Sequence, residues 1–111
     1  MADERFPLNA LVLMKDIMIE KLPLHLEYRR LLTFEHWPKP YISVTKLAQE
    51  GFFYLGLGDY VACRFCGVIL HRFEVNDDPK TEHRIHSPNC NFVLRYNVNN
   101  VEYKPHNYFN Q

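Results

Sequence analysis

The chain has 111 residues, enough for one domain with short extensions, and its 47% hydrophobic and 14% aromatic content is that of a globular protein. Lys+Arg and Asp+Glu number 13 each, so the formal net charge is zero, which argues against a basic nucleic-acid binder. No apolar run reaches the length of a transmembrane helix. We therefore expect a soluble, cytoplasmic protein with neither nucleic acid nor membrane as a partner.

The first predicted element is an amphipathic helix over residues 8–20, because apolar side chains recur there close to a helical spacing. Asn9 is available as its cap, and Pro23 limits its extension. The stripe packs either on its own domain or on a partner, as a homodimer or with an adaptor. Its candidate contact residues are Leu11, Met14 and Met18.

Two further helices are expected before the middle of the chain. One covers residues 24–36 and ends before Pro38, since proline disfavours helical geometry in the residue preceding it. The other covers 44–50, with Ser43 as its N-cap and Gly51 as its C-terminal stop.

The middle of the chain then changes to a strand pattern. Aromatic and apolar runs at 52–55, 60–63 and 68–71, the first two joined by a glycine turn, predict three short strands. A last helix is expected over 79–86, because Asp78 is a good N-cap and Pro79 suits the first helical position. We therefore predict an α+β fold with a helical extension at 1–23, a domain at 24–95 and a tail or linker at 96–111.

All three cysteines take part in one spacing, Cys63-x2-Cys66-x16-His83-x6-Cys90. Thiolate and imidazole are the donors that Zn²⁺ prefers, and four protein ligands are typical of a structural site. The alternative is three buried free cysteines that only pack. Spacing leaves the histidine open, since His86 lies one helical turn from His83. We expect one structural zinc ion.

Several motifs resemble the baculovirus IAP repeat (BIR) domain of inhibitor-of-apoptosis proteins over about residues 28–94. They are Arg30-Leu31-x-Thr33-Phe34-x-x-Trp37-Pro38, Gly51-Phe52-x-Tyr54-x-Gly56-x-x-Asp59-x-Val61-x-Cys63, Asp77-Asp78-Pro79-x-x-Glu82-His83 and Pro88-x-Cys90-x-Phe92. The resemblance implies a three-stranded antiparallel sheet among short helices. It also implies that zinc is held by Cys63, Cys66, His83 and Cys90, and that Arg30, Gly51 and Asp59 serve the fold.

The same resemblance implies a protein-interaction role in restraining cell death, by binding pro-apoptotic proteins or caspases. Similarity to insect-virus members of the family extends this expectation to a viral protein that acts on host cell death. Family members grip an N-terminal peptide that begins with alanine and adds as a strand beside the third strand. The corresponding residues here are Leu70, Phe73, Asp77, Glu82 and His86.

The chain departs from that groove pattern at three positions. Groove-bearing members have glycine where Ile69 stands, and tryptophan where Phe73 and His86 stand. A branched side chain at 69 takes room that a peptide backbone needs, and large aromatic anchors usually dominate such binding. The alternative is a groove-less scaffold that acts through self-association or an adaptor, without binding caspases or N-terminal peptides directly.

An enzymatic role is not expected. A zinc deaminase needs a glutamate two residues after the ligand histidine, and residue 85 is isoleucine. A RING ligase needs a second, larger set of cysteines and histidines than these residues contain.

Overall fold

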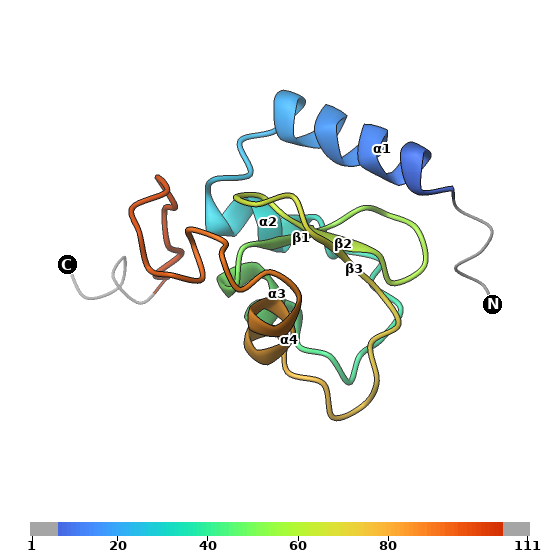
Figure 1. The fold of residues 1–111 in the computed structure, drawn as a ribbon. Helices are drawn as coiled ribbons and strands as arrows, with labels where there is room; N and C mark the ends of the chain where they lie inside the picture. Colours follow the sequence, from blue (N-terminus) through green and yellow to red (C-terminus); the bar gives the residue numbers. More distant parts are fainter. Residues whose placement is uncertain (1–6, 106–111) are drawn as a thin grey trace.

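The computed structural model describes residues 7–105, and its sheet has three antiparallel strands in the order β1-β2-β3 (Figure 1). This confirms the predicted α+β class. The elements in chain order are α1 (Leu8–Lys21), α2 (Glu27–Leu32), α3 (Val44–Gln49), β1 (Phe52–Tyr54), β2 (Val61–Cys63), β3 (Ile69–Leu70) and α4 (Pro79–His86).

Helix ends follow local capping chemistry where the side chains allow it. The Ser43 hydroxyl accepts the N–H of Lys46 at 3.1 Å, and the Asp78 carboxylate accepts that of Thr81 at the same distance. Both predicted caps are confirmed. The Asn9 cap is wrong: α1 begins at Leu8 as predicted, so Asn9 lies inside the helix, and the helix start after Pro7 has no side-chain cap.

The predicted helix over 24–36 is too long at both ends. At its start, Leu26 pairs with Val101 in a parallel bridge, which holds the chain extended until Glu27. At its end, the Thr33 hydroxyl donates to the carbonyl of Arg30 at 2.6 Å and accepts the N–H of Tyr54 at 2.8 Å. A side chain that bonds the backbone in this way competes with continued helix.

Both faces of the sheet are buried, each against its own cluster. One face packs on the side of the short helices through Phe52, Tyr54, Val61, Cys63 and Leu70. The other face packs beneath α1 through Phe53, Leu55, Tyr60 and Ala62, with Ile69 at its margin. In Figure 1, α1 lies on one side of the strands and α3 and α4 on the other. The domain therefore has three layers.

Helix α1 packs its predicted apolar stripe on its own domain, which is the first of the two alternatives given for that stripe. Leu11 is only 3% exposed and Met18 packs against the same cluster, so two of the three predicted contact residues face inward. Met14 is half-buried at the side. The exposed apolar residues on the outer face of this helix are Leu13 and Ile17.

The chain after residue 95 is hydrogen-bonded to the start of α2. Val101 donates to the carbonyl of His25 at 3.0 Å and accepts the N–H of Glu27 at 2.9 Å. The Tyr103 and Tyr28 rings lie 5.9 Å apart. The segment predicted as a tail or linker is thus attached as far as Tyr103. Residues 1–6 and 106–111 of the predicted extensions lie outside the described part of the chain.

Candidate metal centre and peptide groove

The first two candidate ligands are placed by a tight turn at the end of β2. The N–H of Gly67 donates to the carbonyl of Cys63 at 2.9 Å, and Gly67 itself has a φ of +80°. This left-handed geometry is accessible to glycine at little cost. The turn brings Cys66 back beside Cys63, so that both sulfurs face one point.

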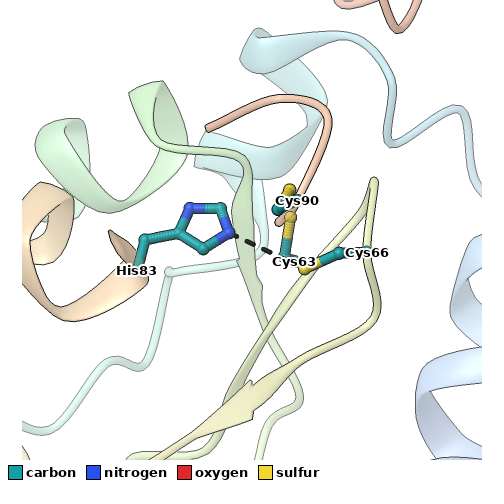
Figure 2. Close-up of side chains that lie close together, drawn as sticks. All are labelled: Cys63, Cys66, His83 and Cys90. Atoms are coloured by element: carbon teal, nitrogen blue, oxygen red, sulfur yellow. Dashed lines mark hydrogen bonds between the residues drawn. The ribbon is translucent and has the colours of Figure 1, made fainter. Parts of the chain in front are cut away.

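Helix α4 and the loop after it supply the other two candidates. One donor atom each from Cys63, Cys66, His83 and Cys90 lies within 4.8 Å of all the others. Figure 2 shows the His83 ring directed at the sulfurs, with Nε2 3.7 Å from Cys66 Sγ. His86 is instead exposed and lies 3.5 Å from the Glu82 carboxylate. The geometry therefore brings His83, and not His86, to the cysteines.

The four residues fit a tetrahedral zinc ion. Zn–S bonds near 2.3 Å and Zn–N bonds near 2.0 Å set neighbouring donors roughly 3.5 to 3.8 Å apart, and the Nε2–Sγ distance agrees. Cys63, His83 and Cys90 are buried and only Cys66 is exposed. With four protein donors, no coordination position is left for a substrate.

Packing orients the His83 ring. Its centroid lies 4.5 Å from that of Phe52 and 6.3 Å from that of Phe92. The other ring nitrogen, Nδ1, is buried and has no hydrogen-bond partner among the described residues. Metal-bound histidines usually donate this proton to an acceptor. Here the two aromatic rings hold the imidazole in place instead.

The cluster favours thiolate, which is the zinc-binding form of cysteine. The hydrogen bond from the Cys63 thiol lowers the pKa of Cys66 to about 3, although burial acts in the opposite direction. A hydrogen bond with Cys63 likewise lowers the pKa of Cys90 to about 6. The Ser87 hydroxyl also donates to Cys66 Sγ at 3.2 Å. The bonds that Cys63 makes to the other two thiols raise its own pKa, so the cluster favours the thiolate form at Cys66 and Cys90.

The five predicted groove residues meet at one hollow of about 320 Å³ beside β3. Leu70, Phe73, Asp77, Glu82 and His86 all line it, together with Ile69, His71 and Arg72. Ile69 also packs against the cluster beneath α1, and the hollow stays open beside it. The structure thus gathers all five predicted residues around one hollow.

Two of these residues also stabilise the fold. Phe73 is only 3% exposed, and its ring lies 6.1 Å from that of Trp37, so it belongs largely to the core. Asp77 Oδ2 accepts the N–H of Glu74 at 2.7 Å and closes the turn before α4. Only part of the Asp77 carboxylate is therefore available to a ligand.

A partly buried ion pair holds Phe73 at the edge of the groove, and no pattern in the sequence predicted it. Lys39 Nζ lies 2.7 Å from Asp59 Oδ2 and from the carbonyl of Phe73, and the N–H of Phe73 donates to the same Asp59 oxygen at 2.8 Å. Burial raises the pKa of Asp59, but the hydrogen bonds from Lys39 and from two backbone N–H groups lower it by more. Asp59 therefore acts as an ionised clamp on Phe73, rather than only as a turn residue.

A short antiparallel sheet between helices, with a Cys₃His cluster beyond its second strand, defines a class of small protein-interaction domains organised around one metal site. The chain belongs to the inhibitor-of-apoptosis family: the family profile "BIR: Inhibitor of Apoptosis domain" matches residues 30–94. The family assignment and the predicted fold are confirmed. The matched region is a protein-interaction module, so the domain acts by binding and not by catalysis.

Sequence relatives agree with this assignment. The chain is 46% identical over 82 residues to "Putative inhibitor of apoptosis" of Sus scrofa, which covers 68% of this chain and 23% of the relative. It is 44% identical over 75 residues to "Apoptosis inhibitor IAP" of Cydia pomonella granulosis virus, and the match covers 68% of this chain and 27% of the relative. The chain thus spans about a quarter of the length of these curated relatives.

Solved structures show the same fold. The DIAP1 BIR1 domain bound to a Grim peptide superposes with a TM-score of 0.73 at 37% identity, covering 80% of this chain and 92% of that one. The autoinhibited dIAP1-BIR1 domain superposes with a TM-score of 0.74 at 36% identity, covering 82% of this chain and 88% of that one. Within residues 7–105, no helix is both long and apolar enough to cross a bilayer.

Proposed function

We propose that this domain restrains cell death by binding the free N-terminal segment of pro-apoptotic proteins or caspases in the hollow beside β3. Cys63, Cys66, His83 and Cys90 hold one structural zinc ion that keeps this surface in shape. The observation that carries the proposal is the convergence of two carboxylates, Asp77 and Glu82, on a hollow of about 320 Å³ next to an edge strand.

The edge of β3 suits an added strand. In the order β1-β2-β3, the third strand has a neighbour on one side only among the described residues. Its outer backbone groups are free to pair with an extended peptide. Side-chain pockets next to the strand then select the sequence of that peptide.

The acidic end of the hollow suits a terminal ammonium group. Asp77 uses Oδ2 for the Glu74 N–H, which leaves Oδ1 to accept from a ligand. Glu82 faces His86 at 3.5 Å on the same helix. An ammonium group can form charge-assisted hydrogen bonds with both acids. The solved neighbour with a Grim peptide supports this type of ligand.

The proposal predicts that Asp77→Asn weakens peptide binding about tenfold to a hundredfold while folding and zinc content stay unchanged. A hydrogen bond to a charged group contributes roughly 1.5–3 kcal/mol, and the asparagine oxygen still accepts the Glu74 N–H. Fluorescence anisotropy with a labelled peptide that begins with a free alanine measures the loss.

Two controls accompany this titration. Asp78→Asn makes the same charge change one residue away, outside the hollow, and keeps its capping oxygen for Thr81. We expect wild-type affinity from it. Acetylation of the peptide removes the ammonium charge and should abolish binding. Equal binding of the free and acetylated peptides would refute an N-terminal peptide groove.

The outer face of α1 favours a second candidate function, a scaffold that acts by self-association or adaptor binding. Leu13 is 60% exposed and Ile17 46%, one turn apart on the same helix face. Leu11 and Met18 already cover the sheet, so this second stripe has no intramolecular role in the described fold.

The double variant Leu13→Ser/Ile17→Ser tests this candidate. We expect the wild-type chain to dimerise in sedimentation experiments and the variant to stay monomeric. Its melting temperature should hold, because exposed substitutions usually change stability by no more than about 0.5 kcal/mol. Leu11→Ala is the contrasting variant, with an expected loss of roughly 2–5 kcal/mol from its buried position. A monomeric wild type would leave only the adaptor form of this candidate.

A further inference from the structure

Three exposed basic side chains converge beside α4, in a depression separate from the peptide hollow. Lys80 and Arg84 lie one turn apart on the helix, and Arg95 approaches from the loop after the last cysteine. They share this depression with Glu50, Phe92 and Val93. No ion pair links any of the three cations to a carboxylate of the described residues. Three positive charges thus share this depression with one carboxylate, that of Glu50, and none of the three is paired with it.

A larger hollow of about 200 Å³ adjoins this depression, because Phe92 and Arg95 line both. Its wall is formed by the loop that includes Tyr96 and Asn100. The Asn100 Oδ1 atom is buried and has no hydrogen-bond partner in residues 7–105. A buried acceptor of this kind normally has a donor, and a ligand in the hollow reaches this atom only when the Asn100 side chain turns toward it.

The loop that forms the wall is held in a costly backbone conformation. Arg95 has a φ of +70° and Asn99 one of +66°. Left-handed geometry in a non-glycine residue costs free energy and persists where the surroundings enforce it. Here the Tyr96 N–H donates to the carbonyl of Asn91 at 2.9 Å, and the bridge at Val101 anchors the far end. The hollow is therefore preformed.

We propose that the surface made by Lys80, Arg84, Arg95 and Asn100 binds an acidic peptide segment of a protein partner. The three cations neutralise its carboxylates, and the Asn100 side chain turns toward the hollow and accepts a backbone N–H from the peptide. A surface of three cations on a chain with zero net charge disfavours a nucleic-acid backbone, which needs a longer run of cations. This site is independent of the groove beside β3.

The test uses the zinc-loaded chain and an N-acetylated, fluorescein-labelled octapeptide of alternating glutamate and alanine. Acetylation keeps this probe out of a site that needs a free ammonium group. We expect saturable binding at low salt, a loss of about tenfold for Lys80→Gln/Arg84→Gln and a further loss of about threefold for Asn100→Leu. The same peptide with glutamine in place of glutamate should not bind.

Lys21→Gln/Lys104→Gln is the matched control, because it removes two exposed positive charges elsewhere on the domain. Its affinity, and that of Asp77→Asn, should stay within about twofold of wild type. The proposal is overturned by absence of saturable binding or by equal losses in the control and the test variant. Tighter binding of a uridine oligonucleotide, lost in the same double variant, would assign the surface to RNA and also overturn it.

Discussion

Replacing Cys66 with serine is expected to unfold the domain at neutral pH. A structural zinc ion contributes roughly 10–16 kcal/mol in small zinc modules, which equals or exceeds the roughly 5–15 kcal/mol stability of a typical domain. A serine hydroxyl does not replace a thiolate as a zinc ligand. Cys66 is also the exposed cysteine of the cluster, so the change removes a donor without opening a cavity in the core. Zinc content by mass spectrometry and near-ultraviolet circular dichroism measure the two losses together.

Ser87→Ala is the control for that experiment. It removes the 3.2 Å hydrogen bond to Cys66 Sγ but none of the four candidate ligands. We expect it to keep one zinc ion per chain and to lose about 1 kcal/mol. A Cys66→Ser variant that stays folded in excess chelator would show that the fold does not depend on a metal, and the proposed role of the cluster would fail.

Local signals in the sequence predicted the parts of the fold that depend on neighbouring residues. The Ser43 and Asp78 caps each bond an N–H three residues ahead, so a short window contains the whole interaction. The same holds for the turn between Cys63 and Gly67. The site residues could be named because their spacing matched a family pattern, and the fold then brought them together.

Interactions between distant parts of the chain gave no such signal. Lys39 lies between two prolines, and its contact with Asp59 and Phe73 joins three loops far apart in sequence. The pairing of Val101 with Leu26 shortens α2 from outside. No periodicity within 24–36 could reveal a backbone bridge to a residue more than 70 positions away. These contacts are settled by the packed fold.

The orientation of α1 was undecided for a different reason. Apolar side chains lie on both of its faces, Leu11 toward the sheet and Leu13 toward solvent. Such a helix has no single stripe from which to read the buried side. The unbroken apolar run Phe52 to Leu55 did hold a clue, since a strand buried on both faces lacks alternation. Its second buried face is the one that α1 covers.

Replacing Arg30 with methionine is expected to destabilise the domain by roughly 3–5 kcal/mol, the cost of breaking a buried charged network on one side. The side chain is fully buried, with 0% exposed. Its guanidinium donates twice to the carbonyl of Ala48, at 2.8 and 2.9 Å, and once each to those of Leu24 and His25, at 3.0 and 3.2 Å. Burial lowers the pKa of Arg30 to about 10, with Glu27 acting against this, so the group stays charged at neutral pH.

Methionine keeps the stem but leaves these carbonyls without their donor, and the end of α3 then loses its tie to the start of α2. Urea unfolding of the zinc-loaded protein measures the change. Arg30→Lys should recover only part of the loss, because one ammonium group cannot reproduce the fork that spans Ala48 and Leu24. Arg29→Met, on the neighbouring but partly exposed residue, should cost no more than about 0.5 kcal/mol. Equally small losses of stability for Arg30→Met and Arg29→Met would contradict this. The buried guanidinium would then not be what joins α2 to α3, and the two helices would be held by apolar packing alone.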